Sequence, residues 1–194
     1  MAPTVAGMTR LLPLIAVVAV LGACGSSAGN SSTSSAENSP PGDIPDNQAY
    51  VAYSPPGAGY RIKVPEGWAR TRAGGVVTFT DKLNTIRMES VPARAAPTVA
   101  TAKRVLVPKL QHTVHGFALR GVASVQRKGG MAIRIAYGAA APASAVTNRT
   151  GQDDVERYVF FHRGRDVVLT LSGPKGADNV DPWKLVTDSL RWSG

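Results

Sequence analysis

The histidines are the first residues whose types and spacing could support chemistry. His112 and His115 form a close pair, and on a helix this spacing would let both rings share a metal ion. Gly116 would end such a helix, however, and no Asp, Glu or Cys stands nearby as a third ligand. His162 stands beside arginines in an apolar run, which is more typical of a strand end than of a catalytic base. The sequence therefore predicts no metal site and no catalytic histidine.

The acidic residues form no recognisable catalytic pair. Asp153, Asp154 and Glu156 cluster, but their spacing lacks the alternating ligands of a calcium-binding loop. Glu66 and Glu89 are the glutamates nearest to predicted strands, and the sequence does not show that they meet. A hydrolase would need a nucleophile with a base, or paired carboxylates. It remains an alternative, and its mark would be a cleft that joins Glu66, Glu89, His112, His115 or His162 to a second titratable group.

The single cysteine, Cys24, has the most specific chemical context. Before it stand one charge, Arg10, and an apolar run too short to cross a bilayer, which is typical of an export signal over residues 1–23. The residues Leu21-Gly22-Ala23-Cys24 then resemble the lipobox of bacterial lipoproteins. The resemblance implies that a diacylglycerol with acyl chains such as palmitate joins the Cys24 thiol. It also implies cleavage between Ala23 and Cys24.

Such a modification would decide where the protein resides. Two or more acyl chains anchor a protein stably, so we expect export and attachment to the outer face of the cytoplasmic membrane. An ordinary signal peptide that happens to contain a cysteine is the alternative. The initiator methionine is also undecided between Met1 and Met8. If translation starts at Met8, Met8-Thr9-Arg10 forms a compact, positively charged beginning of the export signal.

The composition changes after the cysteine. Residues 24–48 are predicted to form the lipidated cysteine and a flexible tether, because Ser, Gly, Asn and Pro dominate the segment. Residues 49–194 are predicted to form a single domain. Of the 22 basic and 13 acidic residues of the chain, 21 and 10 fall in this domain.

The basic excess restricts the partners. Nucleic acid is the usual partner of a basic domain, but an exported domain would not meet it. Anionic lipid, an anionic wall polymer or an envelope protein are the expected partners, and dispersed solvated charges are the alternative. Alternation along strands makes Arg61, Lys63, Arg87 and Arg134 the candidate binding residues.

Periodicity predicts the elements that must position these residues. Strands are expected at 60–64, 76–80, 85–91, 117–126, 131–137, 155–163 and 167–171, with the first three in an antiparallel meander. A helix is expected over 98–114, capped by Thr98 and kinked or broken near Val107 because of Pro108. A second helix is expected to start at Asp181 as N-cap with Pro182 at its first position. Residues 138–154 are expected to form a long exposed loop.

The order of these elements predicts an α+β fold with an antiparallel sheet of about six to seven strands covered by helices. The opening from Gly59 to Trp68, followed by 76–79 and the closing Asp188-Ser189-Leu190, resembles the Mog1/PsbP-like fold over about residues 50–192. This fold occurs in small exported actinobacterial lipoproteins, including relatives of LpqN and LpqT. None of the functional residues of the family's photosystem accessory proteins or of its GTPase-binding protein can be matched here.

The resemblance implies a non-enzymatic binding or accessory module without a cofactor. The sequence therefore predicts a membrane-anchored extracytoplasmic lipoprotein of the cell envelope. An envelope hydrolase, or a carrier that holds lipid or glycolipid between sheet and helix, is the alternative. Trp68 and Trp183 could line a binding groove, or they could belong to the core.

Overall fold

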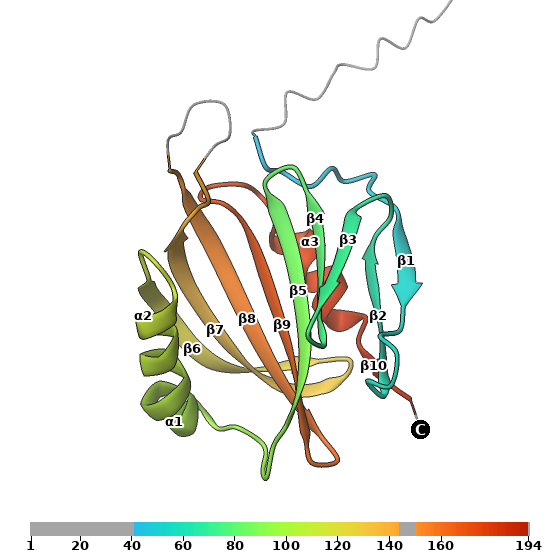
Figure 1. The fold of residues 1–194 in the computed structure, drawn as a ribbon, viewed down its shortest axis with the longest axis vertical. Coiled ribbons are helices and arrows are strands. Elements are labelled where there is room, and N and C mark those ends of the chain that lie inside the picture. The colour runs from blue at the N-terminus through green and yellow to red at the C-terminus, as the bar shows by residue number, and fades with distance from the viewer. Residues whose placement is uncertain (1–40, 144–149, 194) are drawn as a thin grey trace, which may run out of the picture. The chain divides into compact units, whose positions relative to one another are not determined.

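The computed structural model describes residues 41–143 and 150–193 (Figure 1). The strands are β1 (Tyr50–Tyr53), β2 (Tyr60–Pro65), β3 (Ala69–Ala73), β4 (Val76–Asp81), β5 (Asn84–Pro92), β6 (Ala118–Arg127), β7 (Gly130–Ala140), β8 (Gln152–His162), β9 (Arg165–Pro174) and β10 (Arg191–Trp192). The helical segments are α1 (Val99–Thr101), the π-helical η1 (Ala102–Leu106), α2 (Val107–Thr113) and α3 (Val180–Asp188). In this part of the chain, no helix has the length and apolarity to span a membrane.

The strands form two antiparallel sheets, which confirms the predicted α+β class. The large sheet has seven strands in the order β3-β4-β5-β9-β8-β7-β6, and the small sheet has the order β1-β2-β10. The predicted three-strand meander is wrong in one respect, because β2 pairs with β1 and β10 and leaves β4 and β5 as neighbours in the large sheet. Alternation shows which side of a strand is buried, but it does not show which strand lies beside it.

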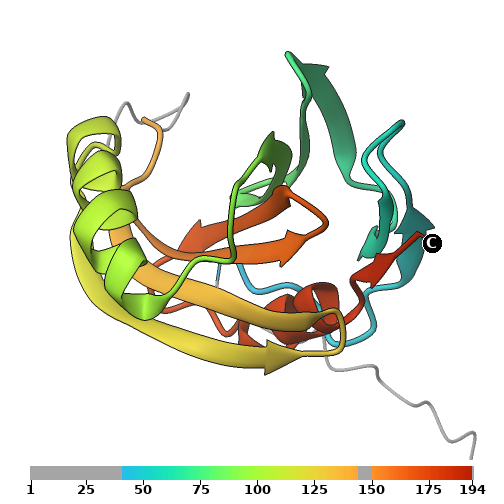
Figure 2. The same cartoon turned by 90° about the horizontal axis from the view of Figure 1, so that it is seen from below.

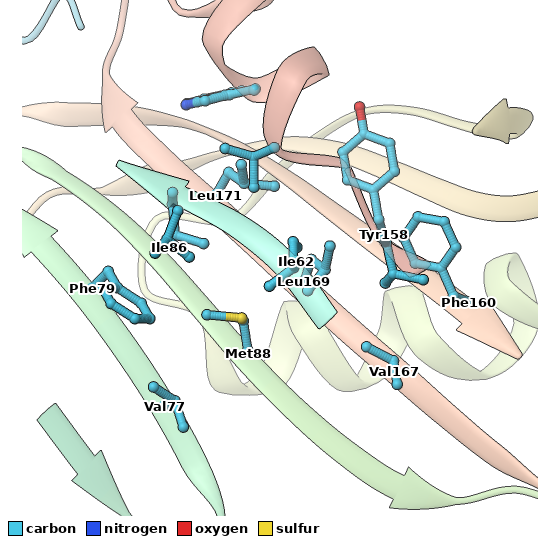
Figure 3. Packing of buried hydrophobic residues seen from close by; sticks show 14 of the residues in the cluster. Ile62, Val77, Phe79, Ile86, Met88, Tyr158, Phe160, Val167, Leu169 and Leu171 are labelled. Carbon is cyan, nitrogen blue, oxygen red and sulfur yellow. The ribbon is translucent and has the colours of Figure 1, made fainter. Parts of the chain in front are cut away.

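One face of the large sheet carries the main core. Side chains of β4, β5, β8 and β9 meet Ile62 of β2 and the inner stripe of α3 in one cluster (Figure 3). Leu169 and Leu171 are fully buried at its centre. Trp183 and Val186 also belong to this cluster, which confirms the predicted apolar stripe of the closing helix at these two positions. Leu190, the third predicted member, is buried in the same cluster but lies beyond the end of α3 at Asp188.

The opposite face is covered only in part. The α1–η1–α2 segment packs over β6, β7 and β8 around a second cluster with Ile133, Ile135 and Tyr137 (Figure 2). Next to this helical cover, Thr78, Arg87, Thr170 and Arg157 stand in register on neighbouring strands. This face is therefore apolar under the helices and polar beside them.

The helical segment has the predicted cap and the predicted irregularity. The Thr98 side chain accepts a hydrogen bond from the Thr101 backbone, and the Thr101 hydroxyl accepts one from the Thr98 N–H at 2.8 Å. A π-helical stretch then runs to Leu106, and regular α-helix resumes at Val107. Pro108 has no N–H for the usual bond to the carbonyl four residues earlier, which accounts for the wider turn at this point.

The start of α3 differs from the prediction. The N-cap is Asn179 rather than Asp181, and Pro182 stands in the first turn instead of at its first position. The Asn179 side chain makes no cap bond because it is used elsewhere. It accepts from the Ile44 N–H at 2.9 Å and donates to the Gly42 carbonyl at 3.0 Å. A tertiary contact thus takes the place of the local cap.

These bonds also move the boundary of the folded domain. Residues 41–48 were predicted to belong to the tether, but Ile44 is buried in the main core and the Gly42 carbonyl also accepts from Asn84 at 2.8 Å. Folded structure therefore begins before residue 49. One isoleucine among polar residues gives little pattern to detect. The rest of the predicted tether, like Cys24, lies outside the described residues.

The predicted loop at 138–154 is too long. β7 continues to Ala140 and β8 begins at Gln152, with the two strands paired to their ends. Backbone pairing requires no apolar side chain, so small and polar residues extend both strands without an alternating pattern. Residues 144–149 of the predicted loop lie outside the described part.

Candidate functional site

A groove between β2 and the outer side of α3 gathers basic residues. Arg61 and Lys63 point outward because Ile62 and Val64, between and after them, are buried in the core. On α3, Trp183 and Val186 are buried against the core, whereas Lys184 and Leu185 are exposed on the outer side of the helix. The end of α3 is joined to β2 by the Ser189 hydroxyl, which accepts from the Lys63 N–H at 2.8 Å.

The groove has a volume of about 650 Å³ and a strongly unequal charge. Its basic residues are Arg61, Lys63, Lys128, Lys184 and Arg191, and its acidic residues are Asp181 and Asp188. Ala52 and Leu185 supply apolar surface between them. Basic residues beside apolar surface suit an anionic partner that also offers some apolar contact.

Asp188, one of the two acids of the groove, is already partnered. Asp188 forms an ion pair with Lys184, and the Arg127 Nε lies 3.8 Å from its carboxylate. Burial raises the pKa of Asp188, but the Lys184 hydrogen bond and the charges of Lys184 and Arg127 outweigh this effect and leave the pKa below its ordinary value. In contrast, Arg61, Lys63 and Lys128 form no ion pair with any residue that the structure describes.

A second, smaller cavity of about 210 Å³ lies between α3 and strands β6, β7 and β8. Arg134 donates to Glu156 at 3.2 Å, and the Tyr158 hydroxyl donates to the other Glu156 oxygen at 2.6 Å. Arg127 in turn donates to the Tyr158 hydroxyl at 3.0 Å. This chain of hydrogen bonds fixes the wall of the cavity, to which Arg120 is also held through an ion pair with Asp154.

The four basic candidates predicted from the sequence do not form one surface. Arg61 and Lys63 share the groove, and Arg134 lines the smaller cavity. Arg87 lies on the opposite face of the large sheet, because its neighbours Ile86 and Met88 point into the main core. The binding role of all four remains a prediction.

Arg87 belongs to an ion-pair cluster on that face. Its guanidinium donates to both oxygens of Glu89, at 3.0 and 3.2 Å, and Arg157 donates to the same carboxylate at 2.8 Å. Burial raises the pKa of Glu89, but the hydrogen bond from Arg87 and the charge of Arg157 act more strongly together and lower the pKa. A carboxylate held ionised between two arginines is a poor proton donor.

The aromatic candidates lie in the core. Trp68 is 9% exposed and Trp183 is 7% exposed, and both belong to the main cluster. Trp183 also contributes to the wall of the smaller cavity. Their burial confirms the interpretation as core residues, and Trp183 alone of the two touches a candidate site.

The histidines are not brought together with acids. His162 stacks on Trp192 with ring centroids 4.5 Å apart, and His112 and His115 border a shallow hollow after α2. Among the described residues, no three His, Cys, Asp or Glu side chains are arranged to hold a metal ion.

Three basic residues of the groove were missed by the sequence reasoning, namely Lys128, Lys184 and Arg191. Lys184 and Asp188 are spaced as an i, i+4 pair, so the outward face of α3 could have been found from the helix pattern. Lys128 lies in the turn between β6 and β7, and Arg191 lies in the short strand β10. No local pattern indicates that these two segments approach β2 and α3.

Several solved structures resemble this chain, among them cyanobacterial PsbP, yeast Mog1p and mycobacterial LpqN. Cyanobacterial PsbP (CyanoP) of Synechocystis sp. PCC 6803 is 17% identical, with a TM-score of 0.54 over 89% of this chain and 98% of its own. The Ran-binding protein Mog1p of Saccharomyces cerevisiae is 9% identical, with a TM-score of 0.53 over 75% of this chain and 96% of its own. LpqN of Mycobacterium tuberculosis, involved in cell envelope biogenesis, is 9% identical, with a TM-score of 0.45 over 77% of this chain and 93% of its own.

No protein-family model matches the chain. No curated protein matches it at a significant level either. At these identities, the structural likeness concerns the fold alone. It confirms the resemblance carried by the opening from Gly59 to Trp68, and the chain therefore has the fold of PsbP and Mog1p.

Proposed function

We propose that this protein is an exported, lipid-anchored binding module that holds anionic groups of the cell envelope in the groove between β2 and α3. The groove carries the proposal, because five basic residues from four separate segments converge on it and four of them form no ion pair among the described residues. Each base near an anionic surface contributes about 1 kcal/mol. Mog1p, a Ran-binding protein, is an example of this fold in a binding role.

The anchor part of the proposal rests on the sequence Leu21-Gly22-Ala23-Cys24. A diacylated Cys24 would keep the domain close to the anionic headgroups of the membrane that holds it. In cells, Cys24→Ala is expected to remove the lipid mass from the N-terminus and to release the protein from the membrane fraction. A wild-type protein whose N-terminal peptide carries no lipid would contradict the anchor.

The hydrolase alternative is not favoured by the geometry of the described residues. Among the acids and histidines named as its marks, Glu89 does meet titratable groups, but these are the permanently charged arginines Arg87 and Arg157. The carrier alternative is not favoured either. The cavity between sheet and α3 is lined by charged residues, and about 210 Å³ is below the size of usual pockets for drug-sized ligands, about 300–1,000 Å³.

The test is co-sedimentation of the chain from residue 25 onward, which retains the compact unit of residues 38–194. We expect binding to anionic vesicles at low salt, weaker binding as salt rises, and little binding to neutral vesicles. The double variant Arg61→Gln with Lys63→Gln is expected to lose about 2 kcal/mol, roughly thirtyfold in affinity.

The matched control is Arg104→Gln, which removes a positive charge from the exposed helical segment on the far side of the large sheet. It is expected to bind the anionic vesicles as the wild type does. Equal binding to both vesicle types, or loss of binding in the control alone, would overturn the role of the groove.

A further inference from the structure

The groove and the smaller cavity lie on adjacent sides of the same helix. Positions three and four apart share a helix face, so Val180, Trp183 and Lys184 border the cavity, while Lys184, Leu185 and Asp188 border the groove. Lys184 stands at the boundary and lines both. Its side chain is 57% exposed, and its ammonium group pairs with Asp188 on the groove side.

The smaller cavity has a positive excess of its own. Arg120, Arg127, Arg134 and Lys184 line it, against the acids Asp154 and Glu156. A guanidinium carries five N–H donors, and Arg134 uses one nitrogen for Glu156 among its contacts in the described part of the chain. Arg134 therefore keeps donors for an anion. Arg127 is occupied, because it donates to Thr187 and Tyr158.

The two hollows differ in shape. The cavity under α3 is walled by the helix and three strands, and its volume suits one small anionic group rather than a whole lipid. The groove is three times larger and more open. A flat membrane surface reaches the rim of the groove but does not enter the walled cavity, whereas a narrow chain can enter both.

We infer that the two hollows form one track around Lys184 that binds a linear polyanion, with successive anionic groups in the cavity and in the groove. This inference rests on the proposed function, because it uses the same groove and narrows the ligand to a chain of linked anions such as a phosphate or phosphodiester polymer. Once one group is bound, the chain holds the next at high effective concentration. Affinity therefore depends on chain length as well as on charge.

The probes are linear inorganic polyphosphate of medium length and inorganic phosphate, added to the chain from residue 25 onward. Calorimetry should show polyphosphate binding far more tightly than inorganic phosphate at equal phosphate concentration. The variants Arg134→Gln in the cavity, Lys63→Gln in the groove and Lys184→Gln at the boundary should each lower polyphosphate affinity by about fivefold. Each should also reduce the slope of log affinity against log salt by about one.

A double-variant cycle tests whether one chain uses both hollows. Arg134→Gln and Lys63→Gln should show coupling for polyphosphate and none for inorganic phosphate, because only a linked ligand connects the two sites. The matched controls are Arg104→Gln and Lys103→Gln, which remove the same side-chain types from the exposed side of the helical segment that covers the other face of the large sheet. Circular dichroism melts of every variant establish that a loss of binding is not a loss of folding.

Several outcomes would overturn the track. Polyphosphate affinity that is unchanged in the three track variants, or equally reduced in the two controls, contradicts it. Binding to anionic vesicles without binding to polyphosphate overturns the track and leaves the proposed function standing. Binding to polyphosphate without binding to vesicles supports the track and overturns contact with the membrane surface, and binding to neither overturns both.

Discussion

The side of the large sheet that packs against α3 and the side that carries Arg87 use charged residues differently. On the Arg87 side, two arginines enclose the carboxylate of Glu89 within the sheet surface. On the α3 side, the main core covers β4, β5 and β9, and the ion pair of Arg134 with Glu156 lies beyond it on β7 and β8. Arg61 and Lys63 stand one layer further out, in a groove where they form no ion pair with any described residue. The comparison teaches that a half-buried carboxylate neutralises the two arginines that share it, whereas Arg61 and Lys63 remain available to a ligand.

Among the variants, the largest loss of stability should come from a substitution in the apolar layer that separates the groove from the large sheet. Trp183→Ala is expected to lower the free energy of unfolding by about 3–5 kcal/mol, because it removes a buried indole from the main core. Urea unfolding measures the change. Val180→Ala on the same helix is the control, since Val180 is 72% exposed and should stay within about 0.5 kcal/mol of wild type. Equal effects in the two variants would show that α3 does not pack as described.

The next largest loss of stability should come from the hydrogen bonds that join the segment around Ile44 to Asn179 at the start of α3. Asn179→Ala leaves the Ile44 N–H and the Asn84 side-chain oxygen without a partner, and should cost about 2–3 kcal/mol. Asp178→Ala changes the exposed neighbouring residue and serves as the control. Proteolysis between Gly42 and Gln48 should rise in the Asn179 variant only, and no rise would mean that this segment is held by other contacts.

The ion-pair cluster on the opposite face should contribute less. Glu89→Gln leaves Arg87 and Arg157 without their shared carboxylate, and should cost about 1–2 kcal/mol because solvent partly screens both arginines. Glu66→Gln, an exposed glutamate, should have an effect near zero. If Glu89→Gln and Glu66→Gln unfolded at the same urea concentration, the ion-pair cluster around Glu89 would make no contribution to the stability of the fold.

The same carboxylate predicts a pH dependence. The pKa of Glu89 is lowered in the folded protein by Arg87 and Arg157 despite burial, so its contribution is present above the unfolded value of about 4.3. It is lost as pH falls through the folded value. The difference in melting temperature between wild type and Glu89→Gln should therefore shrink below about pH 4. A difference in melting temperature that does not change with pH would show that Arg87 and Arg157 do not lower the pKa of Glu89.

The smallest effect is expected in the groove. Lys63→Gln should change the free energy of unfolding by no more than about 0.5 kcal/mol, because Lys63 forms no ion pair among the described residues. Arg134→Gln should cost more, since it removes the donor to Glu156 at 3.2 Å. A Lys63 variant as damaging as the Arg134 variant would remove the contrast between free and partnered bases.

The elements that depend on local chemistry could be predicted from the sequence. Thr98 caps its helix, the helix changes at Val107 before Pro108, and Trp183 faces the core. In each case the residue and its partner are close in the sequence, so spacing and stereochemistry are sufficient. Alternation likewise predicts that Arg61 and Arg87 are both opposite buried residues.

Tertiary structure decided what those outward residues meet. Arg61 and Arg87 have the same local pattern, but β2 leaves the large sheet to pair with β1 and β10, whereas β5 stays in it beside β9. Arg87 therefore shares Glu89 with Arg157 of β8, and Arg61 faces Arg191 and α3. Period-two alternation sets only the face of a strand, whereas strand partners depend on chain crossings and core packing over long sequence distances, and these place the groove.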